Sequence, residues 1–141
     1  MRSKVWKVGE VESVTTVITP WKNASFGELS GDQNPVHFNS TRMAKTHFGR
    51  PIANGIQTLS LIGTALVKMF TTKSTMVIAM QQHNSFLAPV YMDDTITATV
   101  EVIPAPVGKD KKGEYWMTCL VNNQDDVCVL SSTFRVRVLH A

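Results

Sequence analysis

Residues 54–70 have the sequence NGIQTLSLIGTALVKMF, which is the longest helix-compatible stretch of the chain. It opens with Asn54, a favourable N-cap residue. Its apolar residues spread around most of the helix circumference. The polar residues fall at helical spacing on one narrow stripe, formed by Gln57, Ser60, Thr64 and Lys68. The stretch therefore predicts a central helix that other structure covers on most sides.

The periodicity of the apolar residues changes from 3.6 to 2 after residue 75. Residues 76–80 are a continuous apolar run, which predicts a strand covered on both faces. Residues 95–102 alternate between apolar and polar, as a half-buried strand does. Residues 114–121 and 127–138 predict two more strands. The connections between the strands are short, which favours antiparallel pairing.

The part of the chain before the central helix predicts one strand and two short helices. Residues 11–18 are rich in Val, Thr and Ile and predict the first strand. Residues 20–29 predict a helix with Thr19 as its N-cap. Residues 30–35 are dense in turn formers, and residues 40–47 predict a second short helix capped by Asn39 or Ser40. About five strands around one apolar helix predict an α+β fold, with a curved antiparallel sheet wrapped around that helix.

Length and charge exclude several classes of protein. The 141 residues predict a single domain, residues 1–141. The net charge is +3, from 14 basic and 11 acidic residues, which does not indicate a nucleic-acid partner but suits an anionic small ligand. Polar residues interrupt the apolar stretch 52–70, so we expect no membrane span. No signal peptide is visible at the start, which predicts a cytoplasmic location.

The two cysteines do not indicate a metal site. Cys119 and Cys128 lack the spacing of zinc ligands, and we expect neither a metal nor a cofactor. Symmetric closure of the last hairpin would place them nearly opposite each other. A disulfide would then fit the geometry, but a reducing cytosol argues against it, so we expect buried thiols.

A loop before the central helix carries an acid and an imidazole. Residues 30–37 have the sequence SGDQNPVH, with Asp32 and His37 five residues apart around Pro35. Such a rigid loop could aim both side chains at one small volume, where they would transfer protons near neutral pH. Asn34 could anchor one of them by a hydrogen bond. An ordinary turn has the same composition, so the loop alone leaves both interpretations open.

The start of the central helix offers a second candidate feature. The first turn of a helix has free N–H groups and a partial positive charge. Gly55 has no side chain, so a ligand carbonyl could closely approach its backbone N–H, as in an oxyanion site. An ordinary helix start fits the same residues equally well.

Together these segments resemble a known family. Residues 26–37, FGELSGDQNPVH, resemble the hydratase motif of MaoC-like dehydratases and (R)-specific enoyl-CoA hydratases. The similarity continues through FGRPI at residues 48–52, Gly55 and FLAPV at residues 86–90, and spans about residues 8–138. The resemblance implies a hot-dog fold. It also implies a homodimer, or a larger assembly of dimers, whose subunits pair edge to edge and bind acyl thioesters near the interface.

The resemblance also implies an activity and its residues. The activity is reversible hydration of a trans-2-enoyl-CoA to an (R)-3-hydroxyacyl-CoA, without metal or cofactor. Asp32 and His37 would be the proton-transfer pair. The N–H of Gly55 would bind the thioester oxygen, with Asn34 and Asn54 beside it in the site.

Two departures from the family pattern concern substrate identity. The family often has His where this chain has Asn54, and several hydratases have Ser where this chain has Gly63. Ser60 and Thr64 are near Gly63 but occupy different angular positions on the helix. Three alternatives stay open: dehydration of a 3-hydroxyacyl-carrier protein, thioester hydrolysis, and acyl-thioester binding without catalysis.

Overall fold

The computed structural model describes residues 5–140, which form one antiparallel sheet with helices beside it. The sheet has the strand order β1-β3-β4-β5-β2, and all four neighbouring pairs are antiparallel. The strands are β1 (Val11–Val17), β2 (Thr75–Phe86), β3 (Thr95–Ile103), β4 (Glu114–Asn122) and β5 (Cys128–His140). The predicted α+β architecture with five antiparallel strands is therefore confirmed.

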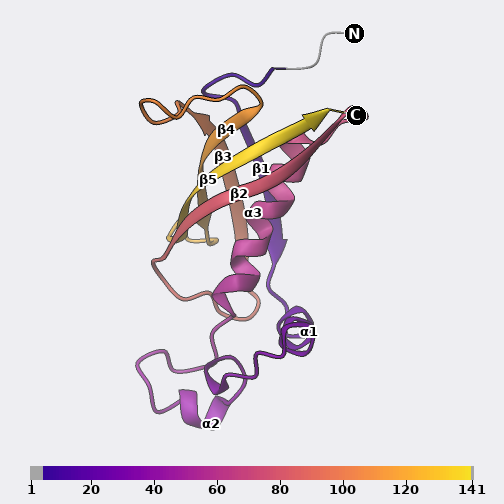
Figure 1. Ribbon diagram of the computed structural model, residues 1–141. Coiled ribbons are helices and arrows are strands. Elements are labelled where there is room, and N and C mark those ends of the chain that lie inside the picture. Colours follow the sequence, from indigo (N-terminus) through magenta and orange to yellow (C-terminus); the bar gives the residue numbers. More distant parts are fainter. Residues whose placement is uncertain (1–4, 141) are drawn as a thin grey trace.

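The central helix α3 (Gly55–Phe70) lies along one face of the sheet and contacts all five strands (Figure 1). Eight of its side chains are buried, whereas Ser60, Thr64 and Lys68 on the predicted polar stripe are exposed. Ile56 and Val67 are also more than half exposed, so this chain alone does not cover the helix completely. No helix within residues 5–140 has the length and apolarity that a membrane crossing requires.

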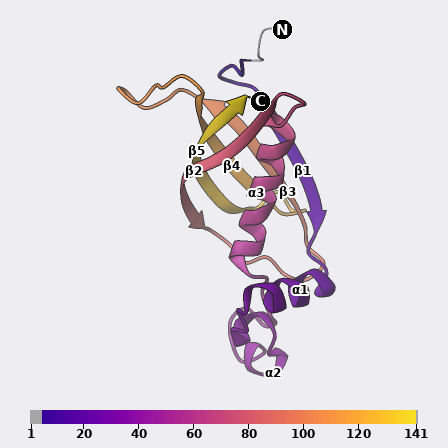
Figure 2. The same cartoon turned by 45° about the vertical axis from the view of Figure 1, so that its right-hand side comes forward.

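The short helices lie beyond the start of α3, at one end of the sheet (Figure 2). Helix α1 (Pro20–Ser30) has the predicted cap, because Thr19 Oγ1 accepts a hydrogen bond from Lys22 N at 3.1 Å. Helix α2 (Ser40–Met43) is capped by Asn39 and is shorter than the predicted range 40–47. After Met43 the backbone forms turns in place of the predicted helix, and the last of these turns ends at Gly49, whose φ is 78°.

Strand β2 corrects the prediction of a strand covered on both faces. It lies at the edge of the sheet and continues to Phe86, six residues beyond the predicted end. Met76, Ile78 and Met80 are 52%, 44% and 42% exposed. An apolar run at an edge strand has the same sequence pattern as a strand buried within its own chain, so periodicity could not separate them.

A β-bulge in β2 changes which side chains face α3. The pairing with β5 shifts by one residue between Ala79 and Gln81, which leaves Met80 as an extra residue. In β5 the even-numbered side chains from 130 to 138 stay buried throughout. Their partners in β2 are odd-numbered up to Ala79 and even-numbered from residue 82 to Phe86. The bulge thus puts Phe86 on the helix side of the sheet.

The cysteines do not face each other, so the expectation from symmetric closure is wrong. Asn122 lies opposite Cys128, and Cys119 lies opposite Ser132. The hairpin closes at Asn122 and Cys128, which places Cys119 three residues further along its own strand. Both thiols are free. Cys119 is fully buried, and this burial raises the pKa of its thiol to about 12.

We expect Phe70→Ala to reduce the free energy of unfolding by about 3–5 kcal/mol. The Phe70 ring is fully buried, with its centroid 5.0 Å from that of Trp6 and 5.4 Å from that of Tyr115, so truncation leaves a cavity. Urea denaturation measures the change. Val107→Ala, at a fully exposed position in the β3–β4 turn, is the control and should change stability by about 0.5 kcal/mol or less. Equal effects of the two substitutions would contradict the assignment of Phe70 to the core.

Candidate active site

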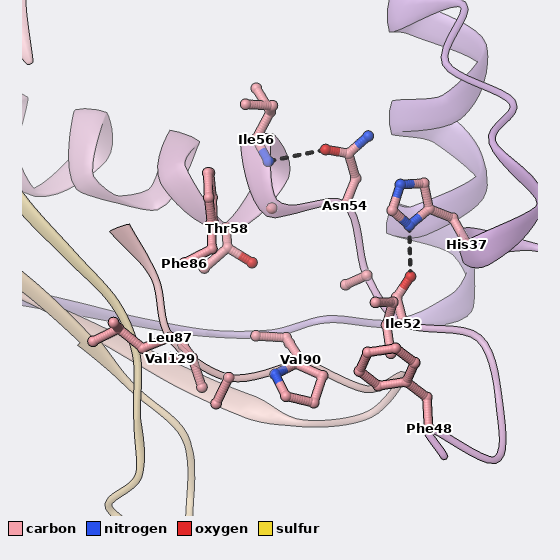
Figure 3. A pocket seen from close by; sticks show the side chains of 14 residues that line it. His37, Phe48, Ile52, Asn54, Ile56, Thr58, Phe86, Leu87, Val90 and Val129 are labelled. Atoms are coloured by element: carbon pink, nitrogen blue, oxygen red, sulfur yellow. Dashed lines mark hydrogen bonds between the residues drawn. The ribbon is translucent and has the colours of Figure 1, made fainter. Parts of the chain in front are cut away.

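A short 3-10 helix, η1 (Pro35–His37), positions the predicted imidazole. Asn34 caps it, because its Oδ1 accepts a hydrogen bond from Val36 N at 3.3 Å. His37 is buried, and its Nδ1 lies 2.7 Å from the backbone oxygen of Ile52. A carbonyl oxygen only accepts hydrogen bonds, so Nδ1 carries a proton whatever the charge of the ring. The ring nitrogen that remains to meet a ligand is therefore Nε2 (Figure 3).

The Asp32 carboxylate is exposed and accepts two hydrogen bonds. Asn34 N donates to its Oδ1 at 3.1 Å, and Asn54 Nδ2 donates to its Oδ2 at 2.8 Å. Both hydrogen bonds lower the pKa of Asp32 below its ordinary value, and the bond from Asn34 N has the larger effect. The nearby charge of His37 lowers this pKa as well. Asp32 is thus a carboxylate at neutral pH.

Asn54 connects the Asp32 loop to the start of α3. Its Oδ1 accepts a hydrogen bond from Ile56 N at 2.9 Å, which caps the helix, while its Nδ2 holds Asp32. The predicted cap is confirmed, but the bond to Asp32 had no signal in the sequence, because the two residues are 22 positions apart. A buried amide can donate and accept at the same time, and here it does both.

The first turn of α3 presents a backbone donor. Within residues 5–140, no group accepts a hydrogen bond from the Gly55 N–H. An added Cβ at Gly55 would lie 2.6 Å from Cε1 of Phe86, so the absence of a side chain lets the Phe86 ring lie against the helix start. The N–H is also at the positive end of the helix dipole.

A cavity of about 460 Å³ lies beside this helix start (Figure 3). His37, Asn54 and Gly55 line it from one side, and the mostly apolar residues 86–90 line it from the other. Asp32 and Asn34 do not line it: Asp32 is connected to it through Asn54, and Asn34 supports the loop. The structure thus brings three of the five predicted site residues into the cavity wall and the other two into the adjoining loop.

Thr58 is a cavity residue that is not among the predicted site residues. Its side chain is almost fully buried, and its Oγ1 has no hydrogen-bond partner in the described part of the chain. The only sequence signal was its position three residues after Gly55 on the helix. Among residues 5–140, no group of three or more His, Cys, Asp or Glu side chains could hold a metal ion.

Comparison with known proteins agrees with this architecture. A family model described as MaoC like domain matches residues 7–120. The 3-hydroxybutyryl-CoA dehydratase of Methylorubrum extorquens is 30% identical over 118 residues, which cover 84% of this chain and 73% of that protein. The (R)-specific enoyl-CoA hydratase of Aeromonas caviae is 32% identical over 102 residues, which cover 72% of this chain and 75% of that protein.

A solved structure confirms the expected hot-dog fold. It is the (R)-hydratase of Aeromonas caviae involved in PHA biosynthesis, which superposes with a TM-score of 0.83 at 27% identity. The alignment covers 96% of this chain and 98% of the hydratase. The matched family model spans most of the chain, and the fold and the two curated relatives agree with it. The chain belongs to the MaoC-like domain family.

Proposed function

We propose that this protein is a hydro-lyase that reversibly hydrates a trans-2-enoyl-CoA to an (R)-3-hydroxyacyl-CoA. The observation that carries the proposal is the position of His37, whose Nδ1 is held by Ile52 O, beside an unused helix-start N–H and an apolar cavity. The hydratase and dehydratase relatives support the same reaction class. The apolar wall suits an acyl chain, whose burial is favourable.

In the proposed reaction, Asp32 and His37 divide the proton transfers. The Asp32 carboxylate takes a proton from the attacking water, whose oxygen bonds to the β-carbon. The electron pair of the double bond moves toward the thioester oxygen, which the Gly55 N–H stabilises. His37 then gives the proton on Nε2 to the α-carbon. The net change is the addition of one water, and a proton passing from Asp32 to His37 restores the pair.

The substrate site also bears on assembly, and we propose that two copies pair through β2. The strand is an edge, and it carries four exposed large apolar side chains, Met76, Ile78, Met80 and Phe86, which favours pairing. Phe86 at its end and Leu87 just beyond are each 56% exposed and line the cavity. A second copy of the chain on this edge would therefore cover the apolar side of the cavity, in a two-fold arrangement that repeats the same contact.

The hydration proposal is tested with purified protein and crotonyl-CoA by following the loss of the enoyl absorbance. We expect hydration that falls by about 10²–10⁴-fold in Asp32→Asn and in His37→Gln, because each removes one proton-transfer group. Asp110→Asn and His140→Gln make the same chemical changes away from the cavity and should leave the rate unchanged. Chiral analysis of the product checks the (R) assignment, and the carrier-protein thioester tested in parallel identifies the preferred carrier.

Two outcomes would contradict this mechanism. Full activity in both site variants would show that Asp32 and His37 do not carry the protons. Release of free thiol without hydration would instead indicate a thioesterase.

The pairing proposal is tested by analytical ultracentrifugation. We expect the wild-type chain to be a dimer and Ile78→Glu to be a monomer, because the substitution places two like charges at the β2 edge. Val11→Glu changes an exposed apolar residue on the opposite edge strand β1 and should remain a dimer. A dimer in the first variant and a monomer in the second would move the interface to β1.

Variants of Asn54 separate its two hydrogen bonds. Asn54→Ala removes the cap, which costs about 0.5–2 kcal/mol, and lets the pKa of Asp32 rise toward its ordinary value of 3.8. Asn54→Asp keeps a capping oxygen but places a second carboxylate beside Asp32, so the pKa of Asp32 should rise further. Denaturation at neutral pH measures the cap, and carboxyl NMR titration measures the pKa.

The pH dependence has a defined sign. The pKa of Asp32 is lowered in the folded protein, so its contribution to stability is present above pH 3.8 and is lost as the pH falls through the lowered value. In Asn54→Ala the stability that is lost on acidification should be smaller. An unchanged Asp32 pKa in both variants would show that the Asn54 bond does not act on the carboxylate.

A further inference from the structure

The Thr58 hydroxyl is buried in the cavity wall without a partner. The residue is 2% exposed, and no atom of residues 5–140 forms a hydrogen bond with Oγ1. A helical threonine often bonds to the backbone oxygen one turn earlier. Here that oxygen, on Asn54, accepts from Gln57 N and Thr58 N at 3.0 and 3.2 Å instead. A buried hydroxyl without a partner is unfavourable, so its presence in a cavity wall indicates that a ligand supplies the partner.

The position of Thr58 on α3 determines which part of a ligand it meets. Residues three apart on a helix are neighbours on one face, so Thr58 lies next to Gly55. Helical side chains also slant toward the N-terminus, which directs the Thr58 side chain back toward the free N–H. In Figure 3 Thr58 extends from the first turn of α3 into the space that His37 and Val90 border from other sides. The two donors thus face one volume.

We propose that Thr58 Oγ1 donates a second hydrogen bond to the thioester oxygen, beside the Gly55 N–H. This inference rests on the proposed hydration and adds a substrate-contacting residue to it. When water adds to the β-carbon, the electron pair moves onto the thioester oxygen, and hydrogen bonds to that oxygen strengthen as its charge grows. They weaken again when the α-carbon takes its proton. The apolar residues Phe86 and Val129 line the same cavity, and an acyl chain lying against them has no atom that accepts a hydrogen bond from Thr58.

The test uses Thr58→Val, which removes the hydroxyl and keeps the shape. With crotonyl-CoA we expect kcat to fall about 10²-fold while KM stays nearly unchanged, because the bond is strongest in the transition state. Thr58→Ser keeps the hydroxyl and should restore most of kcat. Thr64→Val makes the same change on the exposed face of α3 and should behave as wild type. An unchanged kcat in Thr58→Val, or a change in KM alone, would overturn the proposal.

A spectroscopic measurement keeps the test independent of turnover. Acetoacetyl-CoA enolises and has no double bond to hydrate, and its enolate absorbs in the near ultraviolet. We expect the bound enolate fraction to be lower in Thr58→Val than in wild type at saturation, with Thr58→Ser in between or equal to wild type. Equal enolate fractions in Thr58→Val and wild type would overturn the proposal. A wild-type protein that hydrates no enoyl-CoA would instead contradict the proposed function, whereas an active wild type with a fully active Thr58→Val would contradict the Thr58 inference alone.

Discussion

The side-chain amide of Asn54 is the interaction on which the site depends. One end of the amide accepts from the first turn of α3, and the other donates to Asp32. The planar amide of Asn54 therefore fixes the loop that carries Asp32 relative to the start of α3. Because an amide does not titrate, Asn54 can make this connection at every pH at which Asp32 is ionised, whereas the histidine often found there in the family would also change its own charge. The carboxylate and the backbone donor can then be treated as one rigid unit.

The rest of the fold supplies the apolar half of the site. The sheet curves around a helix that is apolar on most sides, and the cavity opens where this cover ends, at the start of α3 and the end of β2. Polar groups come from the helix start and the preceding loop. Apolar groups come from residues 86–90, at and just beyond the end of β2, and from Ile52 and Ala53 before α3. A substrate with a charged or polar thioester end and an apolar chain matches this division.

Local patterns predicted the elements well because local rules govern them. Thr19 and Asn54 cap helices as their residue types favour. Asp32 lies in the predicted loop, whereas His37 is the last residue of the short 3-10 helix η1. No local rule predicts a contact between distant segments. The hydrogen bond from Asn54 to Asp32 joins residues 22 positions apart, so the sequence pattern did not indicate it. The prediction that Ile78 is covered was wrong for a different reason. An apolar pattern indicates that a side chain is to be covered, but it does not indicate whether the same chain or another chain covers it.

The bulge at Met80 determines which face of the sheet each later side chain of β2 points to. Strand side chains alternate with a period of two, so removing or adding one residue between Met80 and Phe86 would turn the polar Ser85 toward the cavity and Phe86 away from it. Removing or adding two residues would leave each side chain on its present face of the sheet. The length of this short segment can thus change only in even steps, which restricts how related chains can differ here while keeping the same cavity wall.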